Sequence, residues 1–248
     1  MSTIISGSGL TTYGPGRIVT DGLILHIDPA NSRSYTGTGT VTKDLVRLNT
    51  TWDMTNLSTT AGENRKFDFP NDLTNRYLLT PNAFVLTSAT NILSFDYFCN
   101  LTVPRSVSAS GLFNDIAQQN GTPYVWVSAN NSHLFAQYLR VSGGWGSTSS
   151  NNFFVGYSNV FVHVGVIINY NTAVISFYRN GQFVEDVAVG SSIRFPNSNS
   201  QKYMGTYQGN YVYNWVGQIG TGKVYDRGLT AAEFLQNFNA LKVRFGVS

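Results

Sequence analysis

The sequence predicts an all-β protein: a two-sheet antiparallel sandwich with one C-terminal helix and an extended N-terminal arm. Three observations support this prediction. Short apolar runs recur along the chain and are separated by Gly, Asn, Pro and Ser, which is typical of strands joined by tight turns. One Asn-Gly pair lies between two such runs, where it favours a hairpin. A helix-capping motif precedes an apolar stripe near the end of the chain, so a single helix closes the fold.

The first 20 residues form the predicted arm. They are rich in Gly, Ser and Thr, with Gly14-Pro15-Gly16 near their end, and such a segment cannot bury enough apolar surface to fold alone. One interpretation is an assembly arm that becomes ordered on a neighbouring subunit. The alternative is a frayed terminus. We place the sandwich domain, helix included, over residues 21–248.

The domain opens with a strand in which Leu23, Leu25 and Ile27 alternate with Ile24 and His26, as in a strand of period two. Eleven further strands follow from the same signals, and so many short strands imply two packed antiparallel sheets. They are Lys66–Phe69, Arg76–Leu79, Ile92–Leu101, Tyr124–Ser128, Leu134–Val141, Phe153–Tyr157, Val160–Tyr170, Ala173–Arg179, Gln182–Val189, Lys202–Tyr207 and Trp215–Tyr225.

The clearest turn is Asn180-Gly181, between the runs Ala173–Arg179 and Gln182–Val189. Asn and Gly tolerate the positive φ angles that a type I′ turn requires at both central positions. This two-residue loop therefore fixes the register of its hairpin.

The only strong helix signal spans about residues 230–242. Thr230 and Glu233 have the spacing of a capping box, in which each side chain bonds the backbone N–H of the other. The residues behind the cap recur at helical spacing and form one apolar stripe that must dock on the sandwich: Phe234, Leu235, Phe238 and Leu241.

Composition excludes several functional classes. The 248 residues, 42% of them hydrophobic, are enough for one domain with a substantial core. Only 12% are charged, and the sixteen basic residues are scattered along the chain rather than gathered into a stripe, which argues against nucleic acid as a partner. Cys99 is the only cysteine, so an intrachain disulfide and a multi-cysteine zinc site are both excluded.

The beginning of the sequence lacks the basic flank and apolar core of a signal peptide. No apolar run approaches the ~20 residues needed to span a bilayer. We therefore expect a soluble protein that is made in a host cytoplasm and does not insert into membranes.

Aromatic residues, at 14% of the chain, are the one excess. The densest run lies between Tyr207 and Trp215. We assign Trp215 to the sandwich core, where alternate tyrosines of this run could also lie. Tyrosine and tryptophan on loops supply rigid contact area with a polar tip. The predicted ligand or interface residues are Trp145, Tyr207, Tyr211 and Tyr213; Trp145 belongs to a Gly-rich segment that we interpret as a loop tip.

No catalytic or metal-binding residue is predicted. The three histidines, His26, His133 and His163, lie on separate segments, and a hydrogen-bonded strand histidine is the interpretation for His163. The sequence has no Gly-x-Ser-x-Gly elbow, no Walker-type loop and no dinucleotide fingerprint. We expect no enzymatic activity and no cofactor.

The order of elements resembles the laminin-G-like, concanavalin A-like jelly-roll family. The segments that carry the resemblance are the opening strand within Asp21–Tyr35, the hairpin Ile175–Gln182 and the closing strand and helix from Ile219 to Glu233. Both ends of the chain, including the tail Gln236–Gly246, are similar to versions of this domain in virion structural proteins of tailed phages, including those of cyanobacteria. The resemblance covers residues 18–246 and implies a jelly-roll sandwich.

The sequence departs from the family's enzymatic members. Glucanases place two or three acidic residues along one strand, because glycoside cleavage needs an acid and a nucleophile or base. Here the three glutamates, Glu63, Glu185 and Glu233, lie in different segments. The aspartates are dispersed as well, unlike the clustered oxygen ligands of calcium-binding relatives. A surface calcium ion held mainly by backbone oxygens is the alternative to an absent metal.

Two hypotheses for function follow. The first is a non-enzymatic phage virion structural protein, such as a head decoration, fibre or tail-associated component, whose arm contacts other virion subunits or copies of itself. The second is a carbohydrate-binding adhesin or lectin that recognises host surface glycans. The first places the protein in the virion.

Overall fold

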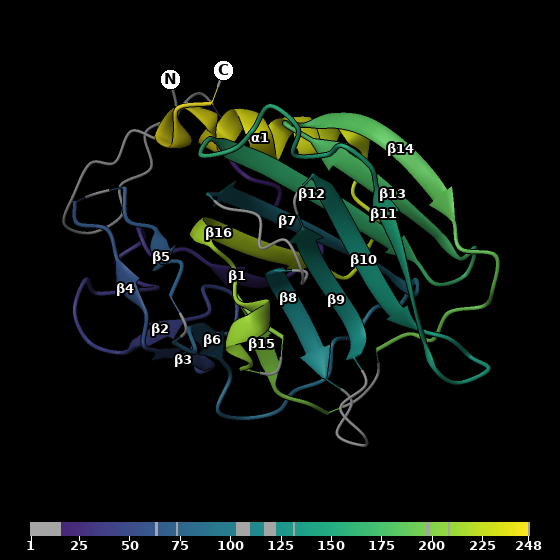
Figure 1. The fold of residues 1–248 in the computed structure, drawn as a ribbon, viewed down its shortest axis with the longest axis horizontal. Coiled ribbons are helices and arrows are strands. Elements are labelled where there is room, and N and C mark those ends of the chain that lie inside the picture. The colour runs from purple at the N-terminus through teal and green to yellow at the C-terminus, as the bar shows by residue number, and fades with distance from the viewer. Residues whose placement is uncertain are drawn as a thin grey trace.

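The computed structural model describes residues 16–247, except residues 63, 73, 103–109, 117–122, 131, 197–198 and 208. The described chain is a sandwich of two antiparallel sheets with one α-helix on the outside (Figure 1). The predicted all-β class, the two antiparallel sheets and the single C-terminal helix are confirmed.

The first sheet, called sheet A, has β16 near its centre, paired with β7 on one side. Two short partners, β5 and β1, pair with successive parts of β16. In spatial order the strands are β14 (Gln182–Ala188), β13 (Val174–Arg179), β12 (Phe161–Asn169), β7 (Ile92–Leu101), β16 (Gly217–Tyr225), β5 (Phe67–Phe69) and β4 (Ser58–Thr59), with β1 (Leu23–Ile27) also on β16.

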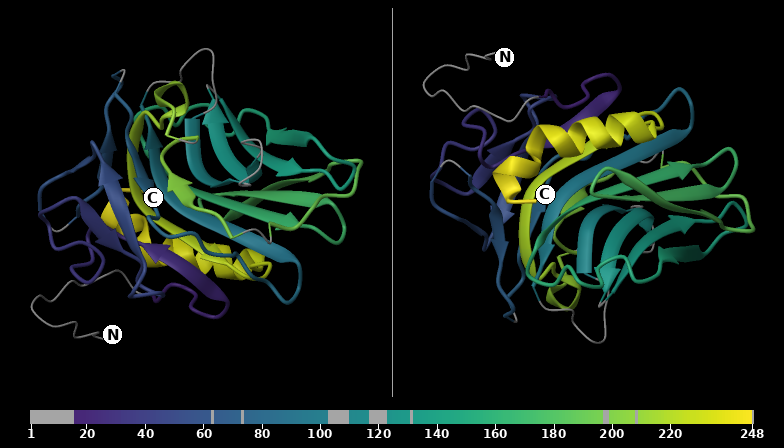
Figure 2. Two further views of the ribbon diagram at one scale, coloured as in Figure 1. Left: turned by 90° about the horizontal axis from the view of Figure 1, so that it is seen from below. Right: turned by 90° about the horizontal axis from the view of Figure 1, so that it is seen from above.

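The second sheet, sheet B, faces sheet A (Figure 2). Its strands in spatial order are β11 (Trp145–Ser150), β10 (His133–Leu139), β9 (Pro123–Asn130), β8 (Ser110–Ile116), β15 (Lys202–Met204), β6 (Tyr77–Leu79), β3 (Thr51–Thr55) and β2 (Val41–Lys43). The strands β8 to β11 follow one another along the chain, as do β2 and β3, whereas β15 lies between β8 and β6 although it comes late in the sequence. Crossovers between the two sheets therefore bring distant segments together in the middle of sheet B.

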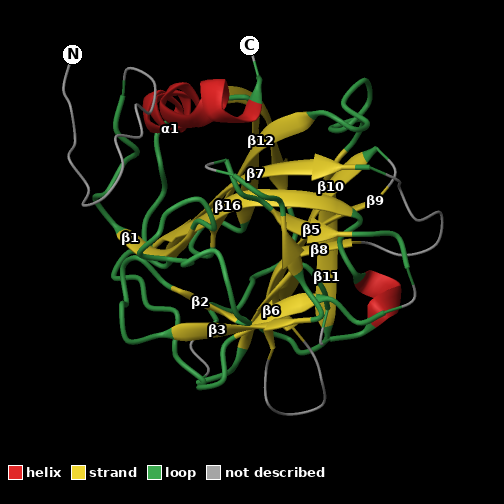
Figure 3. Cartoon of the chain, turned by 90° about the vertical axis from the view of Figure 1, so that its left-hand side faces the viewer, coloured by secondary structure: helices red, strands yellow, loops and turns green. Residues whose placement is uncertain are grey.

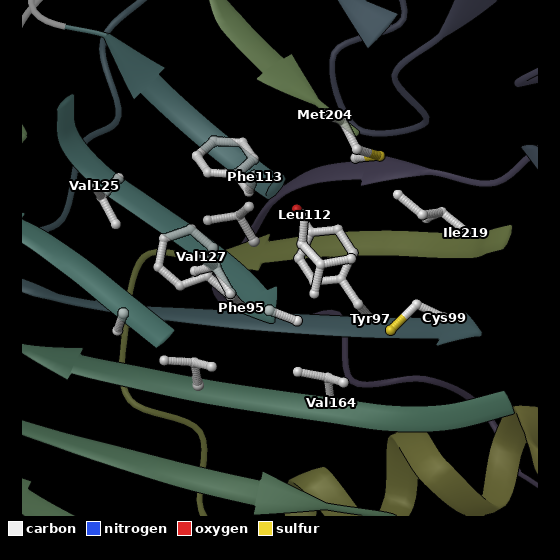
Figure 4. Close-up of a cluster of buried hydrophobic side chains, with 14 of the residues drawn as sticks. Phe95, Tyr97, Cys99, Leu112, Phe113, Val125, Val127, Val164, Met204 and Ile219 are labelled. Carbon is white, nitrogen blue, oxygen red and sulfur yellow. The ribbon is translucent and has the colours of Figure 1, made fainter. Parts of the chain in front are cut away.

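The main core lies between the sheets. Phe95, Tyr97 and Cys99 of β7 point toward Leu112 and Phe113 of β8 (Figure 4), and all five are fully buried. Side chains alternate between the faces of a strand, so the residues between them in β7 face the opposite side of sheet A. Trp215 is also fully buried in this core, as predicted.

That opposite side of sheet A is covered by α1 (Ala231–Phe245) (Figures 2 and 3). The capping box between Thr230 and Glu233 is present, as predicted. Gly165 of β12 and Gly220 of β16 receive the rings of Phe234 and Phe245; a Cβ on either glycine would overlap the ring above it. Small residues on the strands therefore let the helix approach closely.

Two details of the predicted helix are wrong. The helix continues past residue 242 to Phe245. Gly246 then adopts the left-handed conformation, with a φ of 65°, and this conformation ends the helix. Leu235, expected in the buried stripe, is 37% exposed. The docked face consists instead of Phe234, Asn237, Phe238, Ala240, Leu241 and Phe245.

Several strand predictions need correction. Phe153–Tyr157 forms turns rather than a strand; the rings of Phe153 and Phe154 are buried, and this apolar content imitated a strand. The strands β2, β3, β4, β8 and β11 were not predicted. In β8 a bulge follows Gly111, so Leu112 and Phe113 both join the core and the period of two is broken.

The Asn180-Gly181 hairpin is confirmed. The φ angles of Asn180 and Gly181 are 50° and 75°, the left-handed values of a type I′ turn. The turn joins β13 and β14, with Arg179 paired to Gln182.

The predicted arm lies mostly on residues 1–15, outside the described residues. Residues 16–20 lie against α1: Val19 is buried, and its N–H donates to Asn237 Oδ1 at 2.7 Å. The Tyr225 hydroxyl donates to the Val19 carbonyl at 3.1 Å. Among the described residues, no helix is long and apolar enough to cross a membrane.

Candidate functional site

The outer face of sheet B carries aromatic and amide side chains in register. Val125 and Val127 belong to the core, so Trp126 between them points to the outer face. Trp126 pairs with Asn114 on β8 and with Gln137 on β10. Cross-strand neighbours on one face have adjacent side chains, and these three residues therefore form a continuous row, called the amide row.

Three aromatic rings pack at this row. The ring centroid of Trp126 lies 4.6 Å from that of Tyr207 and 5.6 Å from that of Tyr213, and the two tyrosine rings are 5.4 Å apart. Trp126 is only 4% exposed, whereas both tyrosines are half-buried. The tyrosines thus form the outer layer and the indole the inner one.

The loop that bears the tyrosines is fixed by its own hydrogen bonds. It includes a short 3₁₀ helix, η1 (Tyr211–Tyr213), whose cap residue Asn210 accepts from the Val212 N–H. Asn214 Nδ2 donates to the Thr74 carbonyl at 2.7 Å, which ties the loop to the chain before β6. Figure 3 shows η1 on a different side of the molecule from α1.

A second ring pair continues the surface. Tyr203 of β15 is opposite Asn114, and its ring centroid lies 5.5 Å from that of Tyr77 on β6. Burial raises the pKa of Tyr203 and of Tyr207, so both phenols stay protonated at neutral pH. The rings and amides named here leave this surface uncharged.

The polar atoms of the amide row are buried without partners. Both side-chain atoms of Asn114, the Trp126 Nε1–H and Gln137 Oε1 have no hydrogen bond among the described residues. Ser128 Oγ and Asn130 Oδ1, also on β9, share this condition. Buried polar groups are nearly always paired, so this concentration on one face indicates groups held ready for a polar ligand or water.

The predicted site residues fall in three places. Tyr207 and Tyr213 are brought together on Trp126. Tyr211, between them on η1, is 41% exposed. Trp145, 52% exposed, begins β11 opposite Leu139. It is not confined to a loop tip, and alternation along β11 places it on the outer face of sheet B.

The other residues of the site were not predicted from the sequence: Asn114, Trp126, Gln137, Tyr77 and Tyr203. A signal existed for Trp126. Its predicted strand alternates Val125, Trp126 and Val127, and a tryptophan facing away from a valine-lined core needs another contact. The amides gave no such signal, because Asn114 lies on β8, which was not predicted, and Gln137 is an ordinary polar residue within a predicted strand.

Most other candidate chemical groups have structural partners, although His26 Nε2 is buried without a hydrogen bond among the described residues. His163 Nε2 lies 2.9 Å from Asp96 Oδ2 in the buried layer under α1, which confirms a hydrogen-bonded strand histidine. Glu233 bonds Arg227 and its cap, and Glu185 accepts from Ser150 Oγ. Burial lowers the pKa of His26 to about 4. Within the described part of the chain, no three His, Cys, Asp or Glu side chains cluster as metal ligands.

Solved structures with a similar fold include toxin binding domains. The binding domain of Paraclostridial Mosquitocidal Protein 1 aligns with a TM-score of 0.62 and 15% identity, over 88% of this chain and 52% of that one. The receptor binding domain of botulinum neurotoxin C/D mosaic serotype gives 0.65 and 10%, over 88% and 51%. The binding domain of botulinum neurotoxin DC, in complex with SialylT, gives 0.63 and 11%, over 89% and 51%.

At these identities the likeness is one of fold, and the chain spans about half the length of the solved chains it matches. A search among curated proteins finds no match. The sequence itself matches Laminin_G_3, described as the concanavalin A-like lectin/glucanases superfamily, over residues 72–234. Because that match covers well over half of a chain already seen to fold as a two-sheet sandwich, the protein belongs to the concanavalin A-like lectin/glucanases superfamily.

Proposed function

We propose that this protein is a non-enzymatic carbohydrate-binding module of lectin type, and that its ligand surface is the outer face of sheet B. One observation carries the proposal: the amide row holds buried polar atoms without partners directly beneath a layer of half-buried tyrosines. Ligand sites of this kind combine aromatic contact area with a few oriented polar groups.

The chemistry of the surface fits a saccharide. Flat tyrosine and tryptophan rings pack against the apolar face of a pyranose, and their polar tips remain available for hydrogen bonds. Amide groups offer both donors and acceptors, which is what sugar hydroxyls require. Since Asn114, Trp126 and Gln137 are uncharged, the expected ligand is a neutral glycan or the neutral part of a larger one.

The partners of the acidic residues support a binding rather than a hydrolytic role. Glycoside hydrolysis needs two carboxyl groups on opposite sides of one bond. Asp96 and Asp115 are buried in contact with lysines, and Glu185 and Glu233 have partners on different elements. The likeness to toxin binding domains agrees with a lectin-type role.

We propose further that the module serves in a tailed-phage virion, as a head decoration, fibre or tail-associated component. The similarity of both chain ends to phage structural proteins supports this context. A low charge content of 12% also suits closely packed copies, which would otherwise repel one another. Mass spectrometry of purified particles tests it, and absence of the protein from the particles would contradict it.

The ligand surface is tested with an array of neutral and sialylated oligosaccharides, followed by calorimetry on the best binder. Tyr207→Ala and Tyr213→Ala should each weaken binding about tenfold, equivalent to about 1.4 kcal/mol. Phe183→Ala is the matched control, because Phe183 is a 51% exposed aromatic residue on sheet A. An equal loss in the control, or binding to no glycan, would refute the proposal.

Asn114→Leu separates function from stability. A buried amide without partners costs about 1–3 kcal/mol, so a leucine of similar size should raise the melting temperature while abolishing glycan binding. Such opposite changes are typical of residues kept for function. If Asn114→Leu binds the glycan normally, the amide row is not part of the ligand site.

A further inference from the structure

Lys202 on β15 and Asp115 on β8 form a buried pair on neighbouring strands. The two residues lie directly opposite each other in register. Lys202 Nζ is 3.0 Å from Asp115 Oδ1, and both side chains are 0% exposed. The sheet therefore holds an amine and a carboxyl group in contact, away from bulk water.

Ser200 connects the two groups. Lys202 Nζ donates to Ser200 Oγ at 2.9 Å, and the Ser200 hydroxyl donates to Asp115 Oδ1. One hydroxyl thus touches both partners and offers a proton path between them. The other carboxyl oxygen, Asp115 Oδ2, has no hydrogen-bond partner among the described residues.

Burial shifts both groups toward their neutral forms. Burial raises the pKa of Asp115 and lowers the pKa of Lys202, in each case against the opposing effect of the partner charge. Nζ also donates to the carbonyl oxygens of Phe84 and Ser200 at 2.6 and 2.8 Å, and it lies 4.8 Å from the centre of the Phe84 ring. These contacts hold the amine in place beside the carboxyl group. A neutral amine and a neutral carboxylic acid are the species that condense to an amide.

A second buried pair in the same protein shows the opposite environment. Lys223 on β16 lies opposite Asp96 on β7, and both side chains are 0% exposed. Asp96 also accepts from Asn237 Nδ2 at 2.8 Å and contacts His163 Nε2 at 2.9 Å. Burial would raise the pKa of Asp96, but the charges of Lys223 and His163 outweigh it and hold the pKa well below its ordinary value. Asp96 therefore stays a carboxylate.

We propose that Lys202 and Asp115 condense to an intramolecular isopeptide bond. The lysine ammonium group first passes one proton to the Asp115 carboxylate, which leaves a neutral amine and a carboxylic acid. The lone pair of Nζ then forms the new bond to Cγ, the bond from Cγ to Oδ2 breaks, and Oδ2 leaves as water with that proton and a second proton from Nζ. The reaction converts one ammonium and one carboxylate into one amide and one water, so it needs no oxidant, reductant or cofactor.

The site supplies what this condensation requires. Fixed contact between the reacting groups replaces a collision in solution, and exclusion of water disfavours the reverse hydrolysis. The Ser200 hydroxyl stabilises negative charge on Oδ1 as the tetrahedral intermediate forms, and it can carry protons from the nitrogen to the carboxyl group. The product joins β15, a strand of three residues, covalently to β8.

The test is mass spectrometry of the intact, denatured protein and of its tryptic peptides. The intact mass should be lower than the sequence mass by one water. Trypsin should fail to cleave after Lys202, so that the segment 195–223 appears attached to the segment 106–140. A full sequence mass together with release of the peptide 195–202, after fresh purification and after prolonged incubation, would overturn the proposal.

Variants assign the link to this pair. Lys202→Arg keeps the charge but should restore the full sequence mass, and Asp115→Ala should do the same. Lys223→Arg, at the second buried pair, should keep the loss of one water. Ser200→Ala should lengthen the half-time of the mass change at least tenfold. If Lys202→Arg still lacks one water, the link lies elsewhere; the wild-type peptide map decides the question even if a variant fails to fold.

Discussion

Asp96→Asn should strongly destabilise the protein, because it removes the charge that compensates Lys223. Lys223 Nζ contacts Asp96 Oδ1 within the layer between sheet A and α1, where both side chains are 0% exposed. Breaking a buried ion pair by removing one partner leaves an uncompensated charge, at a cost of about 3–5 kcal/mol. A domain of ordinary stability, about 5–15 kcal/mol, would lose a large part of its margin.

The double variant Asp96→Asn/Lys223→Met provides the matched control. It removes both charges, and the new amide oxygen can still accept from Asn237. The double variant should therefore lose less unfolding free energy than the sum of the losses measured for Asp96→Asn and Lys223→Met alone. The difference from additivity measures the coupling of the pair.

The same loss should depend on pH. Lys223 and His163 hold the pKa of Asp96 well below its ordinary value, and the unfolded chain has the ordinary value of about 3.9. A group whose pKa is lowered by folding stabilises the native state above the unfolded pKa, and this contribution is lost as the pH falls toward the folded pKa. The gap between wild type and Asp96→Asn should therefore be full at pH 7 and shrink below about pH 4.

Urea denaturation followed by tryptophan fluorescence measures these quantities, because Trp52 and Trp215 are fully buried. A loss below about 1 kcal/mol for Asp96→Asn at pH 7, or a gap that does not change with acid, would refute the reasoning, since either result would mean that Lys223 finds another counter-charge or loses its proton.

Two further predictions concern α1. Thr230→Ala removes the accepting hydroxyl of the capping box and should cost about 1 kcal/mol of unfolding free energy; an unchanged urea midpoint would show that the cap is dispensable. Phe238→Ala should cost about 3–5 kcal/mol, because the ring is 6% exposed and stacks on Phe98 with centroids 6.2 Å apart. Leu235→Ala, at a 37% exposed position of the same helix, is its control and should change stability by about 0.5 kcal/mol or less; equal losses in the two variants would contradict the docking described for this face.

Features encoded over a few residues were predictable. The Asn180-Gly181 hairpin, the Thr230–Glu233 cap and the strand Ile92–Leu101 follow from turn chemistry, capping chemistry and the length of an apolar run, and all three are present. The prediction failed where tertiary packing replaced the local pattern. The polar strand β11 has few apolar residues to signal it, and the apolar turn after β11 imitated a strand.

Of the residues in the candidate site, only Tyr207 and Tyr213 were also predicted from the sequence. The tyrosine run after residue 206 attracts attention by composition alone. Asn114 and Gln137 are ordinary polar residues in the sequence, and they gain meaning only because β8, β9 and β10 place them on either side of Trp126. A single buried amide has no sequence signature. It points to a ligand site only when the folded chain offers it no hydrogen-bond partner, and that depends on the tertiary structure.

By itself, the sequence determined the all-β class, the family, the closing helix and the low surface charge, because periodicity, end signals and composition are local or additive properties. The tertiary structure decided which polar groups meet. Asp96 and Lys223 are 127 positions apart and share a buried contact, and Asp115 meets Lys202 in the same way. Sheet neighbours are chosen by the path of the whole chain, through crossovers that return distant strands side by side, and no short segment encodes that choice.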